Sequence, residues 1–172
     1  VATQMSNLGL ERYLNSLGLQ LIRTQVGDRY VTEQMFDNGY NLGGEQSGHI
    51  ILSDHNATGD GLVTVVRILS MLCERGKAAS EVCRMFTPLP QRLTNIPCLS
   101  PDVLEKHEVE SVISDCEGQL AGIGRLLVRY SGTEAAVRIM VEAEEERMVH
   151  SVTRAIAGAV EKCVQNSFDG ME

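Results

Sequence analysis

Along the first half of the chain, short apolar runs alternate with segments whose apolar residues have helical spacing, which predicts strands and helices in turn. Residues 1–6 and 19–23 have the composition of strands. The segment between them has helical spacing, and Asn7 is its expected N-terminal cap. Asp28 is the expected cap of a second helix, which the Asn-Gly pair at 38–39 ends.

Two more strands and two more helices are predicted in this half. Residues 40–42 and 49–52 are expected to form a hairpin around a glycine-rich turn, and helices are expected from Asp60 and over residues 78–85. Strands that are apolar on both faces are typical of parallel strands covered by helices. The pattern predicts an incomplete βαβ-type α/β domain. Because the sequence enters directly into a strand without an initiator methionine, we expect it to be truncated at its N-terminus.

A proline-spaced stretch at residues 87–90 separates this half from a smaller unit of the α+β class. The predicted domains are therefore 1–87 and 88–172. Strands are expected near residues 91–96, 125–129 and 137–142, with helices near 101–116 and from 144 to about 163. The last helix carries an apolar stripe formed by Val149, Val152, Ile156, Val160 and Val164. The tail at 165–172 has little to bury and is expected to fray.

The charge balance narrows the class of partner. Fifteen Lys and Arg residues against 23 Asp and Glu give a formal net charge of −8. Nucleic acids and anionic membranes require a basic surface, so neither is an expected partner. Five cysteines without a C-x-x-C pair favour reduced, mostly buried thiols and a cytoplasmic protein.

The glycine-rich segment at 43–49, Gly-Gly-Glu-Gln-Ser-Gly-His, is the first candidate for chemistry. Glycine allows a ligand to approach the backbone closely. In an extended backbone Glu45 and Ser47 lie on one side, and a carboxylate beside a hydroxyl suits the vicinal hydroxyls of a sugar. The alternative is an ordinary hairpin turn with a solvated Glu45.

The second candidate is the run Arg-Tyr-Ser-Gly-Thr-Glu at 129–134, followed by Arg138. The backbone amides and hydroxyls of such a turn can converge on an anion, and two guanidinium groups offer bidentate contacts to phosphate oxygens. The cluster is a local cationic exception in an acidic chain. The alternative is a surface ion pair between Arg129 and Glu134.

Both segments resemble motifs of the α-D-phosphohexomutase superfamily, and the resemblance covers nearly the whole chain. Residues 5–11 (Met-Ser-Asn-Leu-Gly-Leu-Glu) and 26–31 (Val-Gly-Asp-Arg-Tyr-Val) resemble its amino-sugar branch. The resemblance implies most of the family's third domain and its fourth. It also implies a reaction that interconverts glucosamine 6-phosphate and glucosamine 1-phosphate through a bisphosphorylated sugar. Mannose and glucose phosphates remain open as substrates.

The resemblance implies a role for each loop, and both roles position the substrate rather than make bonds. The first loop would bind the sugar through Glu45 and Ser47, together with Gly44, Gln46 and His49. The second would hold the phosphate that is not reacting through Arg129, Ser131, Gly132, Thr133 and Arg138. One crevice is expected to serve both loops.

The resemblance also implies what is missing. The family's catalytic serine and its Mg²⁺ ligands belong to its first and second domains, so we expect neither here and expect those domains as partners. Asp54 and Asp60 are better explained as capping groups than as metal ligands. Arg29 is a candidate cleft residue, with a structural ion pair as the alternative. Ala135 stands where the family usually has a proline.

Three hypotheses of different classes remain open. The chain is part of an enzyme and has no turnover without its N-terminal domains, or it is a free-standing phosphosugar-binding module, or it is a structural interaction domain. The third hypothesis predicts that replacing Arg129 and Arg138 with alanine leaves ligand binding unchanged.

Overall fold

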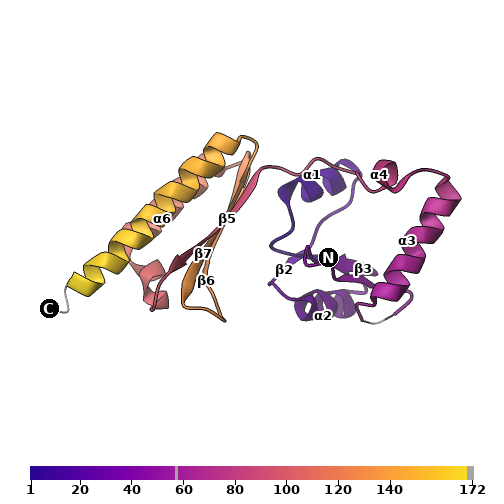
Figure 1. The fold of residues 1–172 in the computed structure, drawn as a ribbon, viewed down its shortest axis with the longest axis horizontal. Helices are drawn as coiled ribbons and strands as arrows, with labels where there is room; N and C mark the ends of the chain where they lie inside the picture. The colour runs from indigo at the N-terminus through magenta and orange to yellow at the C-terminus, as the bar shows by residue number, and fades with distance from the viewer. Residues whose placement is uncertain (57, 170–172) are drawn as a thin grey trace. The chain divides into compact units, whose positions relative to one another are not determined.

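The computed structural model describes residues 1–56 and 58–169, and the chain divides into two compact units, Val1–Pro88 and Leu89–Glu172. Figure 1 colours the first unit from indigo to magenta. Its four-stranded sheet has the order β2-β1-β3-β4. The strands are β1 (Ala2–Thr3), β2 (Arg23–Thr24), β3 (Leu42–Gly44) and β4 (Ile50–Leu52). β1 pairs in parallel with β2 and β3, whereas β3 and β4 form the predicted antiparallel hairpin.

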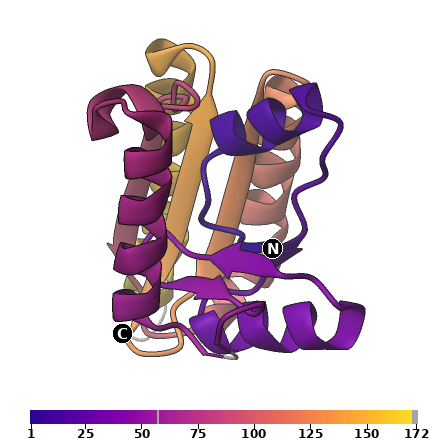
Figure 2. The same cartoon turned by 90° about the vertical axis from the view of Figure 1, so that its right-hand side faces the viewer.

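Four helices surround this sheet: α1 (Leu8–Ser16), α2 (Asp28–Asn38), α3 (Gly61–Arg75) and the short α4 (Ala79–Val82). Figures 1 and 2 show α1 and α2 on opposite sides of the sheet, with α3 beside its edge. α3 contacts the edge strand β4. Val31 and Met35 of α2 form a buried cluster with Ile51. The expected α/β class is confirmed, with the sheet mixed rather than wholly parallel.

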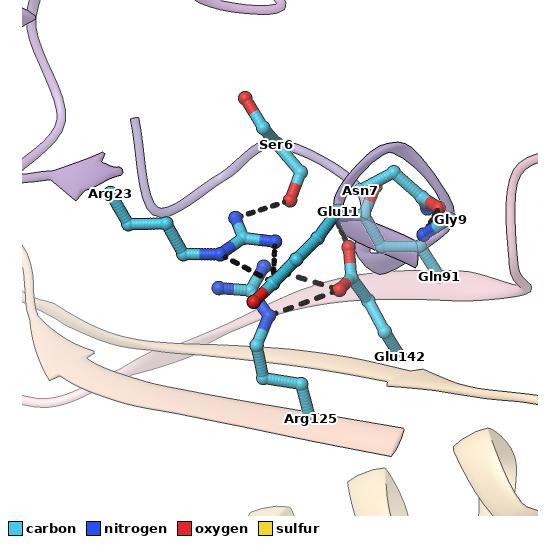
Figure 3. Close-up of polar contacts among 8 residues, drawn as sticks. All are labelled: Ser6, Asn7, Gly9, Glu11, Arg23, Gln91, Arg125 and Glu142. Carbon is cyan, nitrogen blue, oxygen red and sulfur yellow. Dashed lines mark hydrogen bonds and ion pairs between the residues drawn. The ribbon is translucent and has the colours of Figure 1, made fainter. Parts of the chain in front are cut away.

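Of the four capping residues predicted in this unit, Asn7 and Asp60 are confirmed. The Asn7 side chain accepts a hydrogen bond from Gly9 N at 2.8 Å (Figure 3), and Asp60 accepts from Leu62 N at 2.8 Å. The Asp28 prediction is wrong by one position: Gly27, at φ 128°, precedes α2. Because Asp28 is already helical, its carboxylate accepts from the next amide, Arg29 N, at 2.9 Å.

Three predicted elements are shorter than expected. The strand expected at 1–6 is limited to Ala2 and Thr3. The strand expected at 19–23 is reduced to Arg23 and Thr24, because β1 offers only two residues for pairing before the chain turns into α1. The helix expected at 78–85 ends at Val82. The chain leaves the helix there and brings Phe86 against α1, where its ring stacks on Tyr13 with centroids 6.4 Å apart.

The second unit is a three-stranded antiparallel sheet with helices on one face. Its strands β5 (Gln91–Pro97), β6 (Gly124–Tyr130) and β7 (Ala136–Ala143) have the order β5-β7-β6. α5 (His107–Leu120) and α6 (Glu146–Asp169) pack together and supply most of the helical side of the core. The predicted stripe of α6 is confirmed: Val149, Val152, Ile156 and Val160 are buried and Val164 packs against them.

The ends of these helices differ from prediction. The helix expected at 101–116 is split into a 3₁₀ segment, η1 (Pro101–Glu105), and α5, because Lys106 between them is extended, with ψ 130°. α6 continues to Asp169, so the prediction of a frayed tail from residue 165 is wrong as far as that residue. Residues 170–172 lie outside the part of the chain that the structure describes.

The face of this sheet that α5 and α6 do not cover carries three cross-strand rows. Side chains alternate between the two faces of a strand, and Val137, Ile139 and Val141 belong to the helix-covered core. The opposite face therefore presents the residues between them. Its rows are Arg125–Glu142–Gln91, Leu127–Met140–Leu93 and Arg129–Arg138–Asn95.

Glu142 is a fully buried carboxylate in the first of these rows. Gln91 Nε2 donates to one of its oxygens at 2.8 Å and Arg125 Nε donates to the other at 3.1 Å, as Figure 3 shows. Arg125 also supplies the opposite charge, which a buried carboxylate requires.

The cysteines are free, but the prediction that most are buried is wrong. Cys98 and Cys116 are buried, Cys163 is partly buried, and Cys73 and Cys83 are exposed. Burial raises the pKa of the Cys116 thiol above its ordinary value. Within residues 1–56 and 58–169, no helix has the length and apolar character needed to cross a membrane.

Candidate functional site

The first predicted loop is the tight turn that joins β3 to β4. Glu45 N donates to His49 O at 2.9 Å, and Gly48 N donates to Glu45 O at 3.1 Å. Gly48 has φ 97°, a conformation that favours glycine. At Gly44 an added Cβ would lie 2.7 Å from His49 O, so glycine is needed for the close approach of the two strands.

This turn brings three of the predicted sugar-binding side chains together. Ser47 Oγ donates to Glu45 Oε1 at 2.6 Å and lies 2.8 Å from His49 Nδ1. His49 Nδ1 is 3.4 Å from the same Glu45 oxygen. Ser47 and His49 both contact Oε1 of Glu45, so the cluster presents a carboxylate acceptor beside a hydroxyl. That combination suits a ligand with neighbouring hydroxyl groups.

The second predicted loop connects β6 to β7 in the other unit. Ser131 is buried, with an exposed fraction of 3%, and its N donates to Ala136 O at 2.8 Å. Its Oγ lies 3.4 Å from Thr133 N and 3.5 Å from Thr133 Oγ1. Nothing lies within 4 Å of a Cβ built on Gly132, so a ligand can reach the backbone there. The loop thus groups two hydroxyls around an accessible turn.

Arg129 and Arg138 flank this loop as direct cross-strand partners on the uncovered face of the sheet. Arg138 Nη2 donates to Glu134 Oε2 at 3.0 Å, while the Arg138 Nε is buried without a hydrogen-bond partner. The alternative pair of Arg129 with Glu134 does not form. Within the described residues the Arg129 guanidinium has no hydrogen-bond or ion-pair partner. The two arginines form a cationic cluster in which the Arg129 guanidinium and the Arg138 Nε can still donate hydrogen bonds to a ligand.

The remaining candidates have structural roles in this chain. Arg29 Nε donates to Glu33 Oε1 at 2.7 Å, and this hydrogen bond raises the pKa of Arg29 above its ordinary value. The structural ion pair, the alternative for Arg29, is therefore the contact that forms. Asp54 accepts from Asn41 Nδ2 at 2.9 Å instead of capping a helix. Across the described part of the chain, no group of three or more His, Cys, Asp or Glu side chains is placed so that it could hold a metal ion.

Three contacts of the second loop were not anticipated from the sequence. Glu134 pairs with Arg138, Asn95 is the cross-strand neighbour of Arg138, and the Tyr130 hydroxyl donates to Cys98 O at 2.9 Å. All three depend on the register of β7 against its neighbours. Of the three, only the pair of Glu134 with Arg138 could have been found from the sequence. Aligning the chain as a hairpin centred on residues 131–135 would have indicated it.

Comparisons with known proteins agree with this architecture. Residues 1–89 match the family model described as "Phosphoglucomutase/phosphomannomutase, alpha/beta/alpha domain III", and residues 93–159 match "Phosphoglucomutase/phosphomannomutase, C-terminal domain". The chain belongs to the phosphoglucomutase/phosphomannomutase family. It carries that family's third and C-terminal domains in their usual order.

Curated relatives narrow the likeness within the phosphoglucomutase/phosphomannomutase family. The chain is 52% identical over 161 residues to a phosphoglucosamine mutase of Parvibaculum lavamentivorans, and 54% identical over 165 residues to one of Paramagnetospirillum magneticum. Each match covers 94% of this chain but 36% and 37% of the respective relative. The chain therefore spans little more than a third of the length of these relatives.

Solved structures share the fold. An N-acetylphosphoglucosamine mutase of Aspergillus fumigatus has a TM-score of 0.80 at 19% identity, over 95% of this chain and 38% of that one. A second structure of the A. fumigatus enzyme, in complex with GlcNAc-6P and magnesium, has a TM-score of 0.77 at 20% identity, over 93% and 40%. At this level of identity the likeness establishes the family's fold and nothing finer.

Proposed function

We propose that this chain is the sugar- and phosphate-binding part of a phosphoglucosamine mutase, which interconverts glucosamine 6-phosphate and glucosamine 1-phosphate. The observation that carries the proposal is the cluster of Arg129, Arg138 and the loop hydroxyls. Arg129 and Arg138 are direct cross-strand partners in a chain of net charge −8, and the Arg138 Nε is buried without a hydrogen-bond partner. A phosphate group would satisfy that donor and separate the two positive charges.

The loop after β3 supplies the second half of the proposal. Glu45 and Ser47 offer an acceptor and a hydroxyl at hydrogen-bonding distance of each other, which fits two neighbouring hydroxyl groups of a hexose ring. In this function Arg129, Ser131, Gly132, Thr133 and Arg138 hold the phosphate that does not react. These contacts orient the sugar for phosphoryl transfer, and the bond-making groups and Mg²⁺ belong to the enzyme's other domains.

The names of the curated relatives support this substrate in preference to mannose or glucose phosphates. Because the chain covers about 36% of such a relative, we expect the isolated chain to bind substrate weakly and to have no turnover. A free-standing phosphosugar-binding module would instead reach its full affinity without other domains.

Titration of the ¹⁵N-labelled chain with glucosamine 6-phosphate, followed by amide chemical shifts, tests the proposal. We expect shifts at residues 131–134 and at residues 44–49, and inorganic phosphate should shift the first group alone. Shifts that spare both loops would refute the assignment. Shifts at 131–134 alone with the sugar phosphate would keep the phosphate site and remove the sugar site.

A further inference from the structure

Tyr130 is the last residue of β6, and its ring packs against the core on the side of the sheet that α5 and α6 cover. Its direct cross-strand partner, Val137, is fully buried in the same core. Side chains alternate along a strand, so Arg129 faces the opposite, uncovered side. One short stretch of backbone thus joins a residue anchored in the core to a guanidinium of the candidate phosphate site.

The Tyr130 hydroxyl reaches over the central strand to the chain that follows β5. β7 lies between β6 and β5 in the sheet, so this contact joins two segments that are not neighbours in it. The hydroxyl donates to Cys98 O at 2.9 Å and lies 3.3 Å from Leu99 O. A side chain, rather than a strand ladder, therefore holds the end of β6 to this segment.

Cys98 also holds the other end of the turn that joins β6 to β7. Its N donates to Ala135 O at 2.9 Å, just before β7 begins. Cys98 is itself buried, and its thiol donates to Ser100 O at 3.1 Å. The two ends of the turn are therefore attached to the carbonyl and the amide of one well-fixed residue.

The side-chain contacts inside the turn are weaker than those at its ends. Ser131 Oγ lies 3.4 Å from Thr133 N and 3.5 Å from Thr133 Oγ1, and both distances are longer than an ordinary hydrogen bond. A proline would fix φ within the turn, but residue 135 is alanine. The position of the Ser131 hydroxyl thus depends on how the backbone beside it is held.

We propose that Tyr130 is a positioning residue for the phosphate, and that its hydroxyl fixes Arg129 and Ser131 in place before the anion binds. The inference rests on the proposed function, because Tyr130 lies on the covered side of the sheet and acts only through its two neighbours. A site whose groups are already in place loses less binding free energy to ordering them. Without the hydroxyl, the phosphate itself would have to order Arg129 and Ser131.

Tyr130→Phe tests this role, because it keeps the ring in the core and removes the hydroxyl alone. Inorganic phosphate is titrated into the ¹⁵N-labelled chain, and amide shifts at 131–134 report binding. We expect about three- to tenfold weaker binding, the effect that the loss of one hydrogen bond corresponds to. A contact that only stabilised the fold would leave the affinity of the folded chain unchanged. Equal affinity in the two proteins would therefore overturn the proposal.

Tyr30→Phe is the matched control. Tyr30 lies in α2, in the other unit, and its hydroxyl makes no hydrogen bond within residues 1–56 and 58–169. The control should bind phosphate as the unmodified chain does. Equal weakening by Tyr130→Phe and Tyr30→Phe would contradict a specific role for Tyr130.

Salt dependence distinguishes positioning from a change in the charge of the site. Arg129→Ala removes a cation, so its effect on phosphate affinity should shrink at high salt. Tyr130→Phe alters no charge, so its fold-change in affinity should be the same at low and high salt. A loss that disappears at high salt would show that the hydroxyl acts on the electrostatics of the site, against the proposal.

Amide hydrogen exchange without ligand separates this inference from the proposed function. The amides of Cys98 and Ser131 close the two ends of the turn. In Tyr130→Phe both should exchange at least about threefold faster relative to the amide of Ile139 in the middle of β7. Unchanged relative exchange would overturn the role of Tyr130 even where phosphate binds. Absence of phosphate-induced shifts in the unmodified chain would instead refute the proposed function.

Discussion

Arg129 and Arg138 lie directly opposite each other on adjacent antiparallel strands, on the face of the sheet that no helix of their unit covers. Like charges in this relationship destabilise a sheet by about 0.2–1 kcal/mol. Glu134 offsets one of them through its contact with Arg138. The other guanidinium has no such counter-charge within residues 1–56 and 58–169. The pair is therefore better suited to holding an anion than to stabilising the fold.

Replacing either arginine should affect the free energy of unfolding and the affinity for phosphate differently. Arg129→Ala is expected to leave the free energy of unfolding unchanged or to raise it by up to about 1 kcal/mol, because it removes the repulsion. The same change should weaken inorganic phosphate binding about tenfold or more, since a hydrogen bond to a charged group contributes about 1.5–3 kcal/mol. Urea denaturation and phosphate titration measure the two effects. Arg147→Ala, at an exposed position of α6, is the control and should alter neither.

Glu134 should compete with phosphate for Arg138. Its carboxylate contacts the Arg138 Nη2 at 3.0 Å and is 61% exposed, so an exposed ion pair must be broken when an anion binds. Such pairs contribute about 0.2–1 kcal/mol. Glu134→Gln should therefore tighten phosphate binding by roughly two- to fivefold in calorimetric titration, an effect that high salt reduces. The control Glu145→Gln breaks the exposed pair with Arg147 instead. Weaker binding by Glu134→Gln would show that Glu134 supports the site.

The loop after β3 should discriminate sugar phosphate from phosphate. Glu45→Gln keeps the size of the side chain but replaces one carboxylate acceptor with a donor. It should weaken binding of glucosamine 6-phosphate several-fold and leave inorganic phosphate unaffected. Glu74→Gln in α3 is the control, because Glu74 also accepts from a serine hydroxyl, Ser70 Oγ at 3.0 Å, but lies outside this loop. Loss of both ligands on Glu45→Gln would indicate damage to the fold rather than to sugar binding.

The buried carboxylate of Glu142 should make Arg125 necessary for stability. Arg125→Leu would remove a cation that contacts this fully buried carboxylate, so the free energy of unfolding should fall. Adding Glu142→Gln should restore part of that loss, because a neutral amide does not require a cation in the interior. Urea denaturation of the single and double variants measures both. A double variant less stable than Arg125→Leu would mean that the charge is not the source of the cost.

Gly43 should tolerate no side chain. An added Cβ would meet Met35 Sδ, and would lie 2.6 Å from Val31 Cγ1 in the buried cluster under α2. Overpacking of this kind costs about 1–3 kcal/mol, so Gly43→Ala should lower the melting temperature. Gly61→Ala, where nothing lies within 4 Å of the new methyl, should have no such cost. Equal effects of the two variants would refute the packing argument.

Local signals predicted most of the fold, and the failures arose where tertiary contacts decide. Asn7 and Asp60 were recognisable as caps because their side chains satisfy amides two residues ahead. The early end of α4 could not be recognised from local sequence, since it depends on the contact of Phe86 with the ring of Tyr13, which lies far away in the sequence. The exposure of Val66 and Leu69 was equally hidden, because periodicity shows an apolar face and not whether anything covers it.

The sequence indicated which residues form the candidate site, but not most of the contacts that they make with one another. Spacing alone placed Ser47 beside Glu45, because residues two apart share a side of an extended chain. The alternative weighed for Glu134 was an ion pair with Arg129, whereas the pair forms with Arg138, since the choice between the two arginines depends on the β6–β7 register. Arg29 was ambiguous for a similar reason: an i,i+4 carboxylate on its own helix competes with any role in a cleft.

The Tyr130 hydroxyl, which donates to the carbonyls of Cys98 and Leu99, ties the start of the arginine-flanked turn to the segment after β5. Ala135 O accepts from Cys98 N at 2.9 Å, so the far end of the turn is held by the same segment. Backbone motion of the turn is thereby restricted to the three or four residues between these two anchored positions. Motion of this turn should accordingly occur on the nanosecond-to-microsecond scale of a short loop, without the slow separation of strands that a hinged flap would need.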